Sequence, residues 1–361
     1  METLHITPLN AWHKAHGAKM VPFAGWEMPV QYSGILAEHQ HCRTNACVFD
    51  ICHMGEFSLK GAGAKDALAK AVTQNMETLA PGKCRYGFLL NAEGGILDDL
   101  IVYCVAQDEY MLVVNGACAA SDYAAIASRL PQGLNFTDIS DATAKIDLQG
   151  PKSFDVLSRL LPGDWTTLGY FSFVKAAFDG GELIVSRTGY TGELGYEFYL
   201  PAGKAQALWD ALVADADVLP AGLGARDTLR LEMGYPLYGQ DLDVKHTPVE
   251  AGYPGMLTST AEYVGKAKAF TVRQKLIPLA IEGRRSARHY DKVCLPDGTE
   301  VGEVTSGSFS PTLGHSIALA YVTAEAASGT DFVVKAARVE LPAKRVDLPF
   351  FTGGTARTKL K

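Results

Sequence analysis

The chain has 361 residues, of which 47% are hydrophobic and 20% charged, so we expect two or three globular domains without long disordered stretches. The formal net charge is -7 and no dense Lys/Arg stripe occurs, which argues against a nucleic-acid partner because phosphate neutralisation supplies much of such affinity. Seven cysteines are too sparse for a secreted disulfide scaffold, and we expect a cytoplasmic protein.

The first half of the chain alternates helical and strand patterns. Residues 1–20 lack the apolar segment of a secretory signal, and no run of about 18 apolar residues predicts a membrane span. An extended opening precedes a predicted helix at 35–45. Short β-rich runs then predict strands at 55–61, 86–91, 96–105 and 110–115, with helices at 64–74 and 117–130 between them.

The second half contains another α+β block and then a change of pattern. Strands are predicted near 144–149, 182–187 and 196–200, and helices near 151–161, 203–214 and 224–234. After about residue 270, strands punctuated by Pro and Gly follow one another at 276–283, 292–307, 316–322, 331–336 and 337–343. This pattern is typical of a small barrel or sandwich, so three units are expected, the last of them all-β.

Two adjacent acids, Asp98 and Asp99, lie among apolar strand residues, where Asp is depleted. Because side chains alternate along a strand, one acid should face a cleft and its neighbour the other way. A carboxylate against an apolar surface can handle protons or hold a cationic amine. The alternative is a hairpin start with both acids in solvent.

Residues 187–197 form a turn-rich segment with three glycines, two tyrosines and two acids, between two predicted strands. Glycine permits close backbone approach, tyrosine offers a flat apolar face, and a carboxylate accepts paired hydrogen bonds. This combination suits a planar, nitrogen-rich ring such as a pterin. A β-hairpin with a decorated loop is the alternative.

Residues 222–232 predict a loop entering a helix, with Arg226 and Arg230 four residues apart on one face. The third glycine of a dinucleotide fingerprint is missing. A solvated ion-pair face that uses Asp227 and Glu232 is the simpler interpretation.

A group of histidines and cysteines at 39–53 invites a metal interpretation. Its cysteines, Cys42, Cys47 and Cys52, lack the close C-x2-C spacing that structural zinc sites prefer. We therefore expect ordinary thiols and no metal site. The zinc motif HExxH and the nucleophile motif GxSxG are both absent from the sequence.

Several long segments resemble the T-protein family, the aminomethyltransferases of glycine cleavage. They include GAKMVPFAGWEMPVQY, VFDICHMGEF, GGILDDLIVY, SRTGYTGELGYE, PAGLGARDTLRLE, GEVTSGSFSPTLGHSIALAYV and PFFTGGTAR, and they extend over nearly the whole chain. The chain departs from the family pattern at Cys52, where Ser is usual, and near Tyr253, where the family typically has a Trp that lines its cavity.

The resemblance implies an α+β, three-domain cloverleaf of mixed and antiparallel sheets with helices, a C-terminal barrel-like domain and a central folate cavity. We expect a discontinuous first domain at 1–50 plus 140–265, a second at 51–139 and a third at 275–361. In the family, the lipoyl arm of H-protein delivers an aminomethyl group, tetrahydrofolate takes the methylene as co-substrate, and ammonia leaves without any metal.

The resemblance also implies site residues. It selects Asp99 as the essential acid, which holds and polarises the reacting groups, and Glu197 as the residue that binds the pterin. Its other folate contacts correspond to Met54, Tyr86, Asn115, Tyr190, Arg226 and Tyr235. Arg285 and Arg288 would face the lipoyl arm or H-protein. A folate-dependent demethylase of the same fold and a non-catalytic folate-binding protein remain as alternatives.

Overall fold

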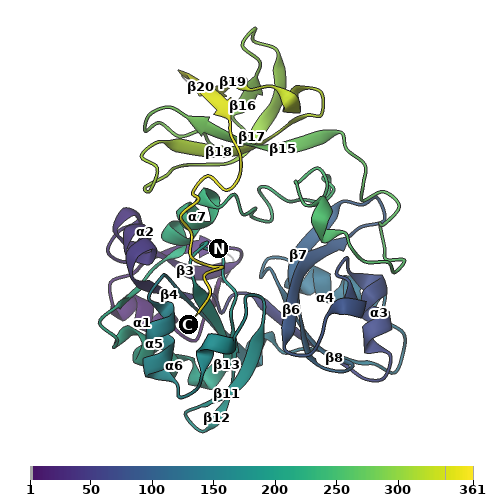
Figure 1. Ribbon diagram of the computed structural model, residues 1–361, viewed down its shortest axis with the longest axis vertical. Coiled ribbons are helices and arrows are strands. Elements are labelled where there is room, and N and C mark those ends of the chain that lie inside the picture. The colour runs from purple at the N-terminus through teal and green to yellow at the C-terminus, as the bar shows by residue number, and fades with distance from the viewer. Residues whose placement is uncertain (1–2, 338, 361) are drawn as a thin grey trace.

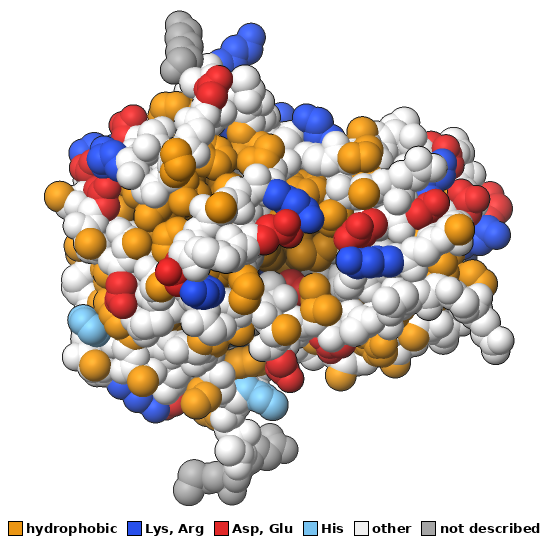
Figure 2. Space-filling view, turned by 90° about the horizontal axis from the view of Figure 1, so that it is seen from below, with side chains coloured by type: hydrophobic (Ala, Val, Ile, Leu, Met, Phe, Trp, Pro, Cys, Tyr) orange, Lys and Arg blue, Asp and Glu red, His pale blue; other side chains and the backbone are white. Residues whose placement is uncertain are grey.

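The computed structural model describes residues 3–337 and 339–360 in three lobes (Figure 1). Met1, Glu2, Arg338 and Lys361, which the expected domains include, lie outside the described residues. Among those residues, no helix is long and apolar enough to cross a membrane. On the face shown in Figure 2, Lys and Arg side chains lie scattered among acidic ones instead of forming a stripe.

The first lobe is built on a six-stranded sheet in the order β11-β12-β13-β10-β4-β14. Its strands are β4 (Ala46–Asp50), β10 (Thr143–Gln149), β11 (Phe173–Phe178), β12 (Gly181–Ser186), β13 (Gly195–Pro201) and β14 (Val218–Pro220). Its helices are α1 (Asn10–Ala15), α2 (Ile35–Thr44), α5 (Ser153–Leu160), α6 (Ala205–Val213) and α7 (Leu223–Glu232). Alternate residues such as Ile146, Leu148 and Phe198 pack against Trp209 of α6 in a buried core.

A small sheet is formed within the first 31 residues, and a second lobe is inserted in the chain between β4 and β10 of the first lobe. The small sheet contains β1 (His5–Ile6), β2 (Lys19–Phe23) and β3 (Trp26–Gln31). The second lobe has a five-stranded sheet, β6-β7-β8-β5-β9, in which β6 and β7 form a long antiparallel hairpin. Its elements are β5 (Gly55–Lys60), β6 (Lys83–Leu90), β7 (Ile96–Ala106), β8 (Glu109–Val114), β9 (Asn135–Asp138), α3 (Ala64–Ala71) and α4 (Ala119–Ala127).

The third lobe is a closed antiparallel barrel, as the Pro- and Gly-punctuated pattern predicts. Its strands are β15 (Gln274–Ile281), β16 (Lys292–Cys294), β17 (Glu300–Phe309), β18 (Ser316–Thr323), β19 (Asp331–Ala336) and β20 (Val339–Arg345). Pairing of β15 with β20 closes the barrel, so neither strand leaves an open edge. Short 3-10 helices lie in all three lobes, at Met76–Thr78, Ser140–Ala142, Trp165–Thr167, Ala202–Lys204, Pro254–Met256 and, within the barrel, Ala326–Ser328.

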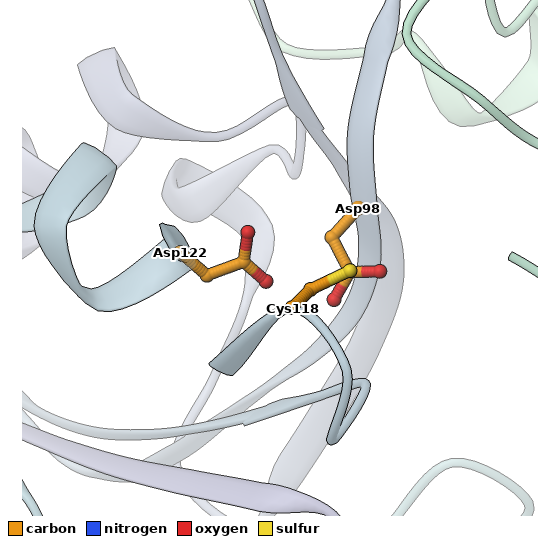
Figure 3. Close-up of side chains that lie close together, drawn as sticks. All are labelled: Asp98, Cys118 and Asp122. Atoms are coloured by element: carbon orange, nitrogen blue, oxygen red, sulfur yellow. The ribbon is translucent and has the colours of Figure 1, made fainter. Parts of the chain in front are cut away.

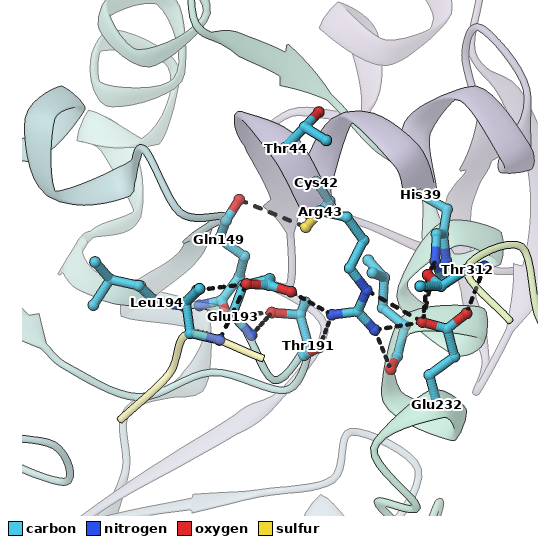
Figure 4. Close-up of polar contacts among 12 residues, drawn as sticks. His39, Cys42, Arg43, Thr44, Gln149, Thr191, Glu193, Leu194, Glu232 and Thr312 are labelled. Carbon is cyan, nitrogen blue, oxygen red and sulfur yellow. Dashed lines mark hydrogen bonds and ion pairs between the residues drawn. The ribbon is translucent and has the colours of Figure 1, made fainter. Parts of the chain in front are cut away.

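Buried charges fix the barrel to the first lobe (Figure 4). Arg43 of α2 donates to Glu193 and to Glu232, with N···O distances of 2.7 Å each. The other oxygen of Glu232 accepts from the Ser310 hydroxyl at 2.5 Å and from the Thr312 backbone at 3.0 Å, both in the barrel. Separation of the barrel would therefore remove the hydrogen bonds from Ser310 and Thr312 to a buried carboxylate, which is unfavourable.

The predicted α+β fold with a C-terminal barrel is confirmed, whereas some strands escaped prediction. β4 is buried at every position, so it shows no alternation of polar and apolar residues. β11 lies at a sheet edge and is largely exposed. The segment 242–269 packs on the β6–β7 hairpin of the second lobe, where Leu242 and Leu257 contact Phe88 and Ile96.

Candidate active site

The β6–β7 hairpin and the end of β8 bring two acids and one amide together. Asn115, just after β8, donates from its side-chain nitrogen to Asp98 Oδ1 at 2.8 Å and to Asp99 Oδ1 at 3.0 Å. Its backbone nitrogen donates to Asp98 Oδ2 at 2.9 Å. Asp98 is fully buried and Asp99 is partly buried, so the interpretation of this pair as a solvated hairpin start is wrong.

Asp99 titrates far from its usual range. Burial, and next the negative charge of Asp98, raise its pKa to about 7, although Tyr86 and Asn115 act in the opposite direction. Its strand partner across the hairpin is Phe88, an apolar residue. A carboxylate with such a pKa can exchange protons near neutral pH.

Tyrosines surround this carboxylate. Burial raises the pKa of Tyr86, Tyr190 and Tyr253, and the charge of Asp99 adds to the effect for each of them, so all three lie within its electrostatic reach. The rings of Tyr86 and Tyr253 are 6.1 Å apart, and those of Tyr190 and Tyr235 are 5.9 Å apart and nearly parallel. Tyr253 thus supplies an aromatic surface at the position where the resemblance expects Trp.

A buried ionic network adjoins the tyrosines. Glu197 Oε1 pairs with Lys145 Nζ at 3.0 Å, and Glu197 Oε2 accepts from the Thr188 hydroxyl at 2.5 Å. Asp147 accepts from Arg226 at 2.5 Å, and the Arg226 guanidinium lies 5.0 Å from the centre of the Tyr190 ring. Burial opposes ionisation of Glu197, yet Lys145 and Thr188 hold its pKa below the usual value.

Met54 lies at the edge of this network, where its sulfur is 3.2 Å from Lys145 Nζ. The neighbouring His53 is buried, and this burial lowers its pKa to about 4, so the imidazole is neutral at pH 7. Its Nδ1 has no hydrogen-bond partner among the described residues.

The geometry therefore unites three segments that are distant in the sequence, 53–54, 86–115 and 145–235. The sequence model described as "GCVT N-terminal domain" matches residues 9–260, and the one described as "Glycine cleavage T-protein C-terminal barrel domain" matches residues 274–352. The chain belongs to the glycine cleavage T-protein family.

Relatives in this family match along their full lengths. A protein of Deinococcus deserti named aminomethyltransferase is 42% identical over 349 residues, which cover 96% of this chain and 97% of the relative. One of Saccharopolyspora erythraea with the same name is 42% identical and covers 97% of this chain and 99% of its own. The glycine cleavage system aminomethyltransferase T of Bartonella henselae, a solved structure, has a TM-score of 0.92 at 32% identity, with 99% and 100% of the two chains covered.

Within this T-protein fold, seven of the expected site residues lie close to Asp99 or in the adjoining network. They are Met54, Tyr86, Asn115, Tyr190, Glu197, Arg226 and Tyr235. Arg285 and Arg288 lie elsewhere, on the exposed loop between β15 and β16 of the barrel.

Sequence reasoning missed two charged residues of the network. Lys145 and Asp147 are two positions apart in β10, so their side chains point to the same face, and Asp147 lies opposite Glu197 across the β10–β13 pair. Both are almost fully buried. Two charges at this spacing, alternating with the apolar residues Ala144, Ile146 and Leu148, are the signal that could have revealed them.

The charged residues of α7, the helix that carries Arg226, do not form the solvated face that the sequence predicts. Arg230 is 1% exposed and pairs with Asp241 at 2.7 Å, while Glu232 is fully buried against Arg43. Only Asp227 keeps a half-exposed side chain. The α7 charges are internal because this helix is covered by α2 and β3 and by the barrel strands β17 and β18.

The cysteines of residues 42–52 are buried thiols that point to backbone carbonyls. Cys42 Sγ lies 3.6 Å from the Gln149 oxygen, and Cys52 Sγ lies 3.3 Å from the Lys145 oxygen. In the described ranges, potential metal-ligating atoms converge instead at Asp98, Cys118 and Asp122 (Figure 3).

Proposed function

We propose that this chain transfers the methylene of an aminomethyl group, carried on the dihydrolipoyl arm of H-protein, to tetrahydrofolate. The family match along the whole chain carries this proposal, because the relatives that align over 96–97% of it are aminomethyltransferases. The products are methylene-tetrahydrofolate, ammonia and the reduced lipoyl arm, which then departs on its partner. We also place the reaction in the cytoplasm.

Asp99 is proposed as the acid that works at the reacting centre. Its carboxylate is held in place by Asn115, 3.0 Å away, and lies among apolar and aromatic groups. In its ionised form it would stabilise positive charge on the departing amine, since low-dielectric surroundings strengthen such an interaction. In its protonated form it could return a proton to a leaving group, and a pKa of about 7 permits both forms.

The neighbouring side chains fit a pterin ring. The Tyr86 hydroxyl and His53 Nδ1 are buried without hydrogen-bond partners among the described residues, and buried polar atoms of this kind normally have one. Glu197 is ionised and aligned by Lys145, as a carboxylate that grips the amidine-like edge of a ring should be. Tyr190 and Tyr235 offer nearly parallel aromatic faces.

Two other functions fit the chain less well. A demethylase of the same fold would also use folate and an acid, but the relatives that match the full chain do not favour it. A non-catalytic folate-binding protein would not need a buried carboxyl whose pKa lies near neutrality.

The deciding experiment measures ammonia release from aminomethylated H-protein with and without tetrahydrofolate. Release that depends on both components, with matching formation of methylene-tetrahydrofolate, is the expected result. A control replaces H-protein with small methylated amines such as N-methylglycine. Methyltetrahydrofolate formed from the small amine alone would replace this proposal with the demethylase, because a methyl group transferred without an oxidant keeps its oxidation state.

A further inference from the structure

Behind Asp99, a second carboxyl pair is buried at the junction of β7 and α4. Asp98 and Asp122 are 0% and 1% exposed, and their oxygens and the Cys118 sulfur all lie within 4.8 Å of one another. Figure 3 shows Asp122 reaching from α4 toward Asp98 on β7, with Cys118 beside them. Asn115 then links Asp98 to Asp99, so three carboxyls form one row.

This pair has no cationic partner in the described part of the chain. Neither acid takes part in an ion pair there, and Arg129, whose charge lowers the pKa of Asp122, donates to the backbone oxygens of Ala71 and Leu90. Two ionised carboxylates this close and this deeply buried would repel each other strongly. One proton between them removes that repulsion and supplies a donor.

We propose that Asp98 and Asp122 share one proton at neutral pH, and that the resulting single negative charge sets the orientation and proton affinity of Asp99. The proton belongs on Asp122. Both oxygens of Asp98 already accept hydrogen bonds from Asn115, whereas Asp122 Oδ2 has no partner. Asp98 and Asp122 are thus positioning residues, which act on Asp99 through Asn115.

The raised pKa values of both carboxyls agree with one proton shared between them, while its placement on Asp122 rests on the hydrogen bonds alone. Burial, followed by the charge of Asp122, raises the pKa of Asp98 well above its usual value, and burial raises that of Asp122 to about 7. Cys118 stays a thiol, because burial and next the charge of Asp98 raise its pKa. The other titratable groups that face Asp99 are the tyrosines of the candidate site, Tyr86, Tyr190 and Tyr253, whose pKa values are also raised.

The consequence for Asp99 can be calculated. The oxygens of Asp98 and Asp99 are bridged by one amide nitrogen, 2.8 and 3.0 Å from them, so the charges lie roughly 5–6 Å apart. At an effective dielectric constant of about 20, one negative charge at this distance raises a neighbouring carboxyl pKa by roughly two units. Removing that charge should lower the Asp99 midpoint by the same amount.

The test titrates the protein with carboxyl-labelled aspartate by carbon-13 NMR, and assigns the signals by comparison with variants. Asp98→Asn removes the charge and should lower the Asp99 midpoint by about two pH units. Asp122→Asn is the matched control, because its amide replaces the carboxylic acid donor and leaves the charge on Asp98. Its Asp99 midpoint should stay within about half a unit of the native value. Asp122→Ala removes the donor and should shift the Asp99 midpoint. Asp122→Asn keeps a donor at this position and should not shift it.

The inference rests on the proposed function only in its link to catalysis, and the two can fail separately. If Asp98 and Asp122 both ionise below pH 5, or if Asp98→Asn leaves the Asp99 midpoint unmoved, the shared proton is refuted. Stoichiometric metal in the purified protein, whose removal changes these titrations, would also refute it. Another outcome is that the Asp99 midpoints move as expected while the pH at which the transfer rate falls on the acid side does not move with them. In that case the shared proton stands and the catalytic role of Asp99 fails.

Discussion

Replacing Glu232 by Gln should loosen the barrel from the first lobe. The native carboxylate is fully buried and accepts hydrogen bonds from Arg43, Ser310 and Thr312, and His39 lies 3.3 Å away. Burial opposes its ionisation, but these partners hold its pKa at about 2. A glutamine keeps the shape and loses the charge, and its amide must direct donors at groups that are themselves donors.

The magnitude follows from the pKa. A carboxyl that titrates near 2 in the folded state and near 4.5 when unfolded contributes on the order of 3 kcal/mol to the free energy of unfolding at pH 7. Loss of one member of a buried ion pair costs about the same, 3–5 kcal/mol. Because the folded pKa is lowered, this stability is complete above the unfolded pKa and disappears as pH falls from about 5 toward 2.

The assay compares thermal and urea unfolding of the native chain and Glu232→Gln at pH 7 and at pH 3. Glu282→Gln serves as the matched control, because Glu282 is an exposed carboxylate on the same barrel, and it should change stability by less than about 0.5 kcal/mol. Glu232→Gln should lose roughly 3 kcal/mol at pH 7 and much less at pH 3. A loss no larger than the control, or one that is unchanged at pH 3, would contradict the buried-charge argument.

Four further predictions concern the candidate site. Asp99→Asn should fold and bind tetrahydrofolate yet lose at least about a hundredfold in single-turnover rate, while Asp98→Asn should lose much less at its own optimal pH. Equal, small losses in the two variants would argue against the role of Asp99. Glu197→Gln should weaken folate binding by about 1.5–3 kcal/mol in calorimetry, and unchanged affinity in a folded variant would make Glu197 a structural residue only. Saturating tetrahydrofolate should raise the melting temperature, since a ligand that binds only the folded state stabilises it, and no shift would count against the folate site. Chelators should leave activity intact, because the thiols of residues 42–52 point to backbone carbonyls; zinc-dependent activity would overturn that expectation.

Local sequence patterns determined much of this protein. Alternation and turn residues predicted the hairpin that carries Asp98 and Asp99, the helices α2, α5, α6 and α7, and the all-β end of the chain. Each of these depends on contacts between residues near one another in the sequence, which periodicity reports directly. The motif GGILDDLIVY and the glycine-rich segment before Glu197 were also sufficient to suggest the family and the site.

Only the tertiary structure decided how the charges are used. Helical spacing places Arg226 and Arg230 on one face but cannot show that Asp147 and Asp241, 79 and 11 residues away, neutralise them in the interior. Nor can strand alternation show that Asp98, turned away from Asp99, meets Asp122 of α4. Whether a charge is solvated, paired or forced to share a proton depends on which distant segments cover it, because burial and long-range partners set its free energy.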